Sequence, residues 1–114
     1  MITLTTVEIE RRILTLLDAL EAETYSYADL SDLAAQAEAD YKIKSSKSLV
    51  HESASNPKMT IGERQARVEI GCAVELRAWK VSEARRQASK EALLSLRARL
   101  DALRSLSANV RAQT

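Results

Sequence analysis

Apolar residues near the N-terminus recur at separations of three and four positions, which places them on one face of an α-helix. The members of this first stripe are Ile9, Ile13, Leu16, Leu17 and Leu20. Thr5 and Glu8 precede most of the stripe in the pattern of a capping box, in which the hydroxyl and the carboxylate satisfy free N–H groups of the first turn. The pattern therefore predicts a helix from about residue 6 to about residue 24.

A second helix is expected from about residue 27 to about residue 51. Its stripe is narrower and richer in alanine, and consists of Tyr27, Leu30, Leu33, Ala34, Ala37, Tyr41 and Leu49. Between the two stripes, residues 24–27 are poorer helix formers, and Ser26 is a candidate N-cap for a new helix. We therefore predict a break near Tyr25, which leaves open one kinked helix or two separate helices.

A loop and a long third helix follow. Residues 52–59 gather polar turn formers and Pro57, the single proline of the chain, and are predicted to form the loop. Thr60 and Glu63 match a second capping box. Because no proline interrupts the roughly fifty residues that follow, the sequence predicts one helix over about residues 60–112.

The apolar pattern of this long helix changes character about halfway along. The first half carries a stripe of small and β-branched residues, here called the small-residue stripe: Ala66, Ile70, Ala73, Val74, Val81, Ala84 and Ala88. The second half carries apolar residues in the three-and-four spacing of a coiled-coil seam. These residues are called the leucine set: Leu93, Leu96, Leu100, Leu103 and Val110.

Folding the chain back at Pro57 brings similar stripes together. The leucine-rich first helix then lies opposite the leucine set, and the alanine-rich second helix lies opposite the small-residue stripe. We therefore predict an all-α fold, a long antiparallel helical hairpin with its first arm broken into two helices, coiled-coil-like, in a single domain over residues 1–114. Because two helices bury only one side each, we also expect a homo-oligomer, a dimer forming a four-helix bundle through the leucine set.

Composition supports the all-α prediction and bears on several classes of site. Two glycines and one proline are too few for the turns of a multi-stranded sheet. Cys72 and His51 are single residues of their types and cannot supply the four protein ligands of a structural zinc site, so neither a metal nor a cofactor is expected. No apolar run approaches the roughly 20 residues that span a bilayer, and the N-terminus lacks the features of a signal peptide. We expect a cytoplasmic, unprocessed protein without membrane contact.

The sequence carries no catalytic motif. It has no nucleophile elbow, no phosphate-binding glycine loop and no paired Cys or His. His51 fits a capping or solvent-exposed role near a helix end, and Cys72 fits a small buried residue. Trp79 is either a core anchor or an interface hot spot, with Tyr41 roughly across from it. We therefore do not expect an enzyme.

Charge is distributed unevenly along the chain. Residues 1–40 contain nine acids and two arginines, whereas residues 41–114 contain fifteen Lys or Arg and seven acids. Either the two halves pair with each other, or each contacts a partner. Four basic residues repeat every seven positions beside the leucine set and are expected to form interhelical ion pairs: Lys90, Arg97, Arg104 and Arg111.

The region around the loop carries the candidate nucleic-acid-binding residues, here called the basic tip set. They are Lys42, Lys44, Lys47, Lys58, Arg64 and Arg67. They lie outside the stretch opposed by most of the acids, so their charge is expected to be available for weak, sequence-independent contact with phosphates. The alternative is a solvated face that binds nothing.

Three short parts of the chain resemble a known group of proteins. They are Ala39-Asp40-Tyr41-Lys42, then Thr60-Ile61-Gly62-Glu63-Arg64-Gln65-Ala66, and Leu103-Arg104-Ser105-Leu106 with Asn109-Val110-Arg111. They are similar to segments of small helical, coiled-coil proteins of tailed phages that are encoded near recombination and single-strand-binding genes. The resemblance implies an accessory role in phage DNA recombination or replication, exerted by binding DNA or a DNA-processing protein. The alternative is a helical module that binds and modulates a host or phage protein without contacting nucleic acid.

Overall fold

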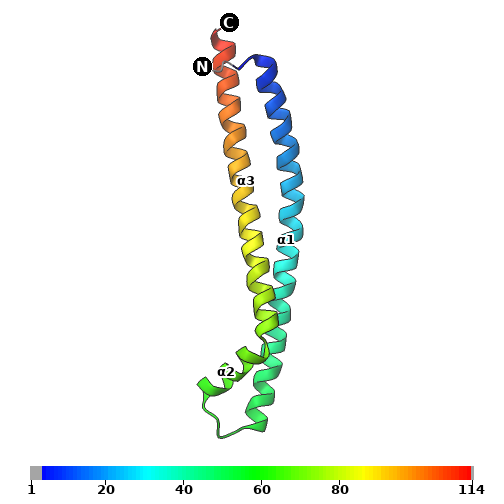
Figure 1. The fold of residues 1–114 in the computed structure, drawn as a ribbon, viewed down its shortest axis with the longest axis vertical. Coiled ribbons are helices and arrows are strands. Elements are labelled where there is room, and N and C mark those ends of the chain that lie inside the picture. Colours follow the sequence, from blue (N-terminus) through cyan, green and yellow to red (C-terminus); the bar gives the residue numbers. More distant parts are fainter. Residues whose placement is uncertain (1–3, 114) are drawn as a thin grey trace. The chain divides into compact units, whose positions relative to one another are not determined.

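The fold was determined as a computed structural model, which describes residues 4–113. Over this range it contains three helices and no strand: α1 (Thr6–Ser55), α2 (Ile61–Gly71) and α3 (Ala73–Gln113). Helix α3 returns antiparallel along α1, and α2 lies between them in the sequence, at the turn (Figure 1). The predicted all-α helical hairpin is confirmed.

Helix α1 begins where the first capping box predicts. The backbone N–H of Thr5 donates to Glu8 Oε2 at 3.2 Å, and the N–H of Glu8 donates to Thr5 Oγ1 at 3.2 Å. This reciprocal pair satisfies two of the N–H groups that the first turn leaves without a partner. The start of the first arm is therefore set by residues within three positions of each other.

Of the two alternatives left open near Tyr25, two separate helices are wrong, because α1 is one helix of 50 residues. The Thr24 hydroxyl, which could have competed with the helix, donates to the carbonyl of Leu20 at 2.7 Å and so is satisfied inside it. No glycine or proline occurs between Thr6 and Ser55. Poor helix propensity alone costs only about 0.7 kcal/mol or less per residue, which is too little to end a helix that packs on a neighbour.

The loop is shorter than predicted. Helix α1 continues through Ser55, so the predicted loop of residues 52–59 begins too early, and the chain turns over residues 56–60 instead. The extra turn is supported by Asn56, whose side-chain N–H donates to Glu52 Oε2 at 3.0 Å. After the loop, Thr60 and Glu63 form the second capping box, as predicted.

The predicted single helix over residues 60–112 is also wrong, because the chain interrupts it at Cys72. Cys72 has φ −108° and ψ 18°, outside the helical region, while its N–H still reaches the carbonyls of Ile70 and Val68. Gly71 precedes it and weakens the helix by about 1 kcal/mol relative to alanine. Val68 of α2 and Cys72 at the interruption are both buried, at 6% and 0% exposure. The break therefore lies directly after the weakest helix former of this stretch and at a buried residue.

The chain divides into two compact units, each of which contains parts of α1 and α3. Unit 1 comprises Met1–Ala28 and Gln87–Thr114. In its described part, the start of α1 packs against the end of α3, and the two helices bury a leucine-rich seam. The buried apolar side chains of this unit are Ile9, Leu16, Leu93 and Leu100, with Ser89 and Ser107 as buried polar residues.

Unit 2 comprises Asp29–Arg86, and it contains the end of α1, all of α2 and the start of α3. Its buried side chains are Ala34, Val68 and Cys72. The rings of Tyr41 and Trp79 stack between α1 and α3, with centroids 5.4 Å apart. The predicted position of these two aromatic residues across from each other is therefore confirmed.

The small-residue stripe does not face α1, contrary to the prediction. All of its members are exposed: Ala66, Ile70, Ala73, Val74, Val81, Ala84 and Ala88. Near its start, α3 instead turns Leu76 and Trp79 inward, and both are half-buried. These larger side chains remove more apolar surface from water than alanine and valine, so they determine the rotation of α3 about its own axis.

Candidate functional site

All six residues of the basic tip set lie in unit 2. Lys42, Lys44 and Lys47 lie on α1, Lys58 lies in the loop, and Arg64 and Arg67 lie on α2. Their surroundings decide whether their charge faces solvent or is compensated inside the chain.

Lys44 forms an ion pair with Glu75 of α3. The Lys44 Nζ atom lies 2.6 Å from Glu75 Oε1. The hydrogen bond from Lys44 lowers the pKa of the Glu75 carboxyl, and the same bond raises the pKa of Lys44. This pair connects α1 to α3, so its first role is structural.

Two arginines of α2 hold the loop and the end of α1. Arg67 Nη1 lies 3.3 Å from Glu52 Oε2. Arg64 Nη2 donates to the carbonyl oxygens of Pro57 at 2.9 Å and Asn56 at 3.3 Å. Because carbonyls at the end of a helix and in a loop lack helical partners, a guanidinium is well suited to satisfy them. Both side chains are therefore engaged in the turn itself.

Lys42 contributes to a cluster of aromatic and basic side chains. Its Nζ atom lies 2.6 Å from Glu38 Oε1 and 5.9 Å from the ring centroid of Trp79. The Nζ atom of Lys80 lies 4.3 Å from the same centroid. Trp79 is thus contacted by Tyr41 and by two ammonium groups, an arrangement that stabilises cations through the ring quadrupole.

The expected availability of the basic tip charges is wrong for Lys42, Lys44 and Arg67, because a carboxylate compensates each. Lys47 and Lys58 are exposed and form no ion pair within residues 4–113. The tertiary contacts therefore leave a smaller basic surface at the turn than the composition indicates.

Three of the four basic residues beside the leucine set differ in this respect from Lys42, Lys44 and Arg67. Lys90, Arg97 and Arg104 are exposed, and none of them forms an ion pair with another described residue. The expected interhelical ion pairs are therefore wrong for these three residues. Their charge faces solvent along α3 in unit 1.

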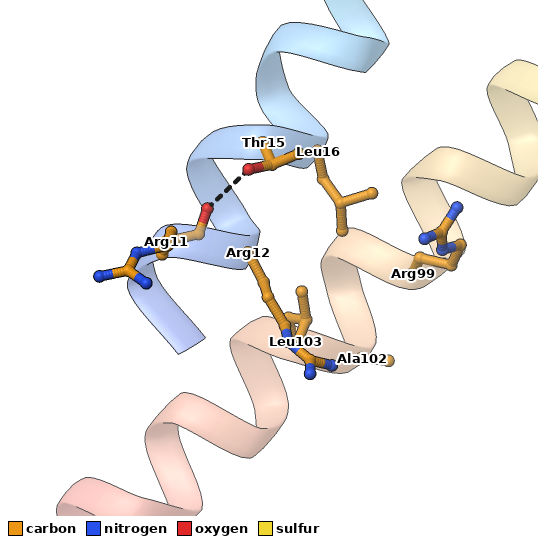
Figure 2. A pocket seen from close by; sticks show the side chains of 7 residues that line it. All are labelled: Arg11, Arg12, Thr15, Leu16, Arg99, Ala102 and Leu103. Carbon is orange, nitrogen blue, oxygen red and sulfur yellow. Dashed lines mark hydrogen bonds between the residues drawn. The ribbon is translucent and has the colours of Figure 1, made fainter. Parts of the chain in front are cut away.

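A pocket in unit 1 is lined by three arginines. Its lining consists of Arg11, Arg12, Thr15, Leu16, Arg99, Ala102 and Leu103 (Figure 2). The Arg12 side chain crosses from α1 to lie beside Leu103 of α3, whereas the guanidinium groups of Arg11 and Arg99 point away from the pocket. No carboxylate lines the pocket. Because the three guanidinium groups diverge, they do not form a converging anion site.

The leucine set, predicted as the oligomer interface, is covered within the chain. Leu93 and Leu100 are buried, and Leu96, Leu103 and Val110 are half-buried. The start of α1 packs on them in unit 1, and this covers Leu93 and Leu100 and part of the other three side chains. The assignment of the leucine set as an oligomer interface stays a prediction.

Large apolar side chains are exposed in both units, but the two with the highest exposed fractions lie in unit 2. Ile70 of α2 is 79% exposed and Val74 of α3 is 78% exposed. On α1, Leu33 and Ile43 are also exposed. Sequence reasoning missed this surface because it assigned Ile70 and Val74 to the interior. The neighbouring cation Arg77, four positions before Val81, was the available signal that this side of α3 faces water.

The remaining candidates are isolated. His51 is exposed, and the buried Cys72 thiol lies 3.8 Å from the Ser48 hydroxyl. The described residues contain no group of three or more His, Cys, Asp or Glu that could hold a metal ion. None of the helices, over the range described, is both long and apolar enough to cross a membrane.

The chain matches no protein-family model, no curated protein and no solved structure.

Proposed function

We propose that this chain is a non-enzymatic helical interaction module whose partner is a protein. The observation that carries the proposal is the exposed apolar surface of unit 2, where Ile70 and Val74 remain 79% and 78% exposed. Single exposed apolar residues are ordinary on protein surfaces, but several at helical spacing are typical of an interaction face. Ile70 lies near the end of α2 and Val74 near the start of α3, and Val81 lies seven positions after Val74, on the same side of α3.

The charges of the turn support a protein partner over nucleic acid. Three of the six residues in the basic tip set are compensated by carboxylates within the chain. Binding to nucleic acid depends on cations that neutralise phosphates and release counterions. A lysine that already pairs with a carboxylate contributes less to that electrostatic term, whereas Ile70 and Val74 have most of their surface exposed to solvent.

Site-specific photo-crosslinking tests the proposal. A benzophenone side chain at Val74 is expected to form a covalent adduct with a protein in the cells that express the chain. The same group at the exposed Asn109, on α3 of unit 1, serves as the matched control. Equal labelling at both positions, or no adduct from Val74, would contradict the proposal.

A second candidate function is accessory binding of DNA, in line with the resemblance to phage recombination proteins. The observation in its favour is the row of Lys90, Arg97 and Arg104, which repeats every seven residues and forms no ion pair within residues 4–113. Such a row can contact phosphates without reading sequence. Lys47 and Lys58 add two exposed cations at the turn.

Fluorescence anisotropy with a single-stranded oligonucleotide at low salt tests this candidate. Replacing Lys90, Arg97 and Arg104 with glutamate should abolish binding, and the parent should lose affinity steeply as salt rises. Replacing Lys47 and Lys58 with glutamate separates the turn from the row. If the parent does not bind at micromolar concentration, or if both variants bind as the parent does, direct DNA contact is excluded.

A further inference from the structure

Helix α1 carries an acidic and apolar outer stripe in unit 2. Leu33 and Ile43 are 55% and 56% exposed. Asp32 directly precedes Leu33, Asp40 lies three positions before Ile43, and both aspartates are exposed. Neither aspartate forms an ion pair within residues 4–113. We call these four residues the acidic stripe.

Helix α3 carries a basic and apolar outer stripe in the same unit. Val74 and Val81 are 78% and 41% exposed. Arg77 and Arg85 lie four positions before and after Val81, so helical geometry places each of them next to that valine. Both arginines are exposed, and neither pairs with a carboxylate among the described residues. We call these four residues the basic stripe.

The two stripes flank the same side of the α1–α3 seam. Asp40 directly precedes Tyr41, which stacks on Trp79, and Arg85 directly precedes the half-buried Arg86. Each of these charged residues therefore directly precedes a residue of the seam. In an antiparallel helix pair, residues that precede equivalent seam positions on the two helices lie along the same edge of the seam. The acidic stripe and the basic stripe therefore lie side by side and both face outward, so they do not cover each other.

The spacing of the charges matches between the stripes. Asp32 and Asp40 are eight residues apart, and Arg77 and Arg85 are also eight residues apart. Eight helical residues correspond to about 12 Å along the axis. An antiparallel pairing of one stripe with the other therefore brings both aspartates to the level of both arginines. Leu33 and Val81 then lie between the charges, and Ile43 and Val74 lie just beyond them.

From this charge complementarity, we propose that the partner of unit 2 is a second copy of the chain, with the acidic stripe of each copy docked on the basic stripe of the other. This inference rests on the proposed function, because it names the protein that covers the exposed apolar surface. A two-fold axis parallel to the helices places α1 of each copy against α3 of the other copy, so the same contact forms twice. The interface is self-complementary, as required for a closed dimer. It differs from a dimer through the leucine set, which stays inside each hairpin.

Charge exchange tests the proposal by sedimentation across a range of protein concentrations. The parent is expected to form dimers. Variant one, Asp32→Lys with Asp40→Lys, and variant two, Arg77→Glu with Arg85→Glu, should each weaken self-association by roughly tenfold or more, because like charges then face each other. An equimolar mixture of the two variants should restore association, since all four charge pairs are then opposite in sign.

Two controls separate the interface from general effects. The pair Glu91→Lys and Asp101→Lys reverses two exposed acids on α3 of unit 1 and should leave the dimer unchanged. Circular dichroism establishes that each variant retains its helices. Val74→Ser with Val81→Ser should weaken association without changing its salt dependence.

The outcomes are distinct. A monomeric parent, or a mixture that fails to restore association, overturns the dimer. If Val74 then crosslinks to a different protein, the proposed function stands and only the identity of the partner is wrong. If the parent dimerises but the charge variants associate as the parent does, the two stripes are not the interface. Absence of any adduct from Val74 contradicts the proposed function itself.

Discussion

Ser89 donates a hydrogen bond to Glu23 across the leucine-rich seam of unit 1, with the Ser89 Oγ atom 2.6 Å from Glu23 Oε1. Ser89 is 5% exposed, so its hydroxyl would have few other partners. The bond joins α1 to α3 at a position where the apolar residues on either side could also accommodate a shifted register. A polar pair of this kind favours one alignment, because any slip leaves a carboxylate in the seam without a donor.

Ser89→Ala should therefore destabilise the chain by about 1–2 kcal/mol, since the Glu23 carboxylate loses its donor while it remains in the seam. The double variant Glu23→Leu with Ser89→Ala should recover most or all of that loss, because both polar groups are then replaced by apolar ones. Urea unfolding followed by circular dichroism measures both changes. A double variant less stable than Ser89→Ala alone would mean that the pair does not behave as a coupled unit.

The Lys44–Glu75 ion pair predicts how stability depends on pH. The folded-state pKa of Glu75 is lowered from its ordinary value of 4.5, so its contribution is present above that value and is lost as pH falls through the folded pKa. The folded-state pKa of Lys44 is raised above 10.5, so its contribution is present below that value and is lost as pH rises through the folded pKa.

Glu75→Gln should consequently flatten the dependence of stability at both the acid and the alkaline edge. The urea midpoint, measured at a series of pH values with Trp79 fluorescence as the probe, reports the effect. Glu69→Gln removes an exposed carboxylate of α2 that forms no ion pair within residues 4–113, and it serves as the control. An unchanged pH profile for Glu75→Gln would show that the ion pair contributes nothing in solution.

Gly71 offers a stabilising substitution at the end of α2. A Cβ atom at this position would meet nothing within 4 Å, and the residue does not have a positive φ. Gly71→Ala should raise the free energy of unfolding by about 0.5–1 kcal/mol, mainly by restricting the unfolded chain. The unfolding midpoint should be measured at a protein concentration low enough to exclude association. A destabilised variant would indicate that the interruption at Cys72 needs the freedom of glycine.

The Tyr41–Trp79 stack gives a fourth prediction. Tyr41→Ala should destabilise unit 2 by about 1–2 kcal/mol through loss of ring contact in a half-buried site. Tyr41→Phe should keep most of the stability, because the Tyr41 hydroxyl forms no hydrogen bond with another described residue and the ring remains. Trp79 is the single tryptophan of the chain, so its emission reports both variants directly. Equal losses for Ala and Phe would mean that the hydroxyl, not the stack, is the stabilising group.

The starts of two helices could be read from the sequence because the interactions that make them are local. Thr5 with Glu8, and Thr60 with Glu63, satisfy each other's backbone groups within three residues. The inward position of Ile9 and Leu16 follows from helical spacing in the same way, since a strongly apolar stripe leaves one side of the helix to bury. The two helix starts and the inward face of α1 therefore do not depend on contacts with distant parts of the chain.

The candidate site depended on contacts that local sequence does not contain. Lys44 is compensated by Glu75 and Arg67 by Glu52, which lie 31 and 15 positions away, so charge counting along the chain could not show that these cations are engaged. The outward rotation of Ile70 and Val74 is likewise a tertiary result. It follows from the larger burial gained by Val68, Cys72 and Trp79 on the other side. The pattern of residues determined that α3 would have an apolar face, but only competition between faces for the surface of α1 decided which one was covered.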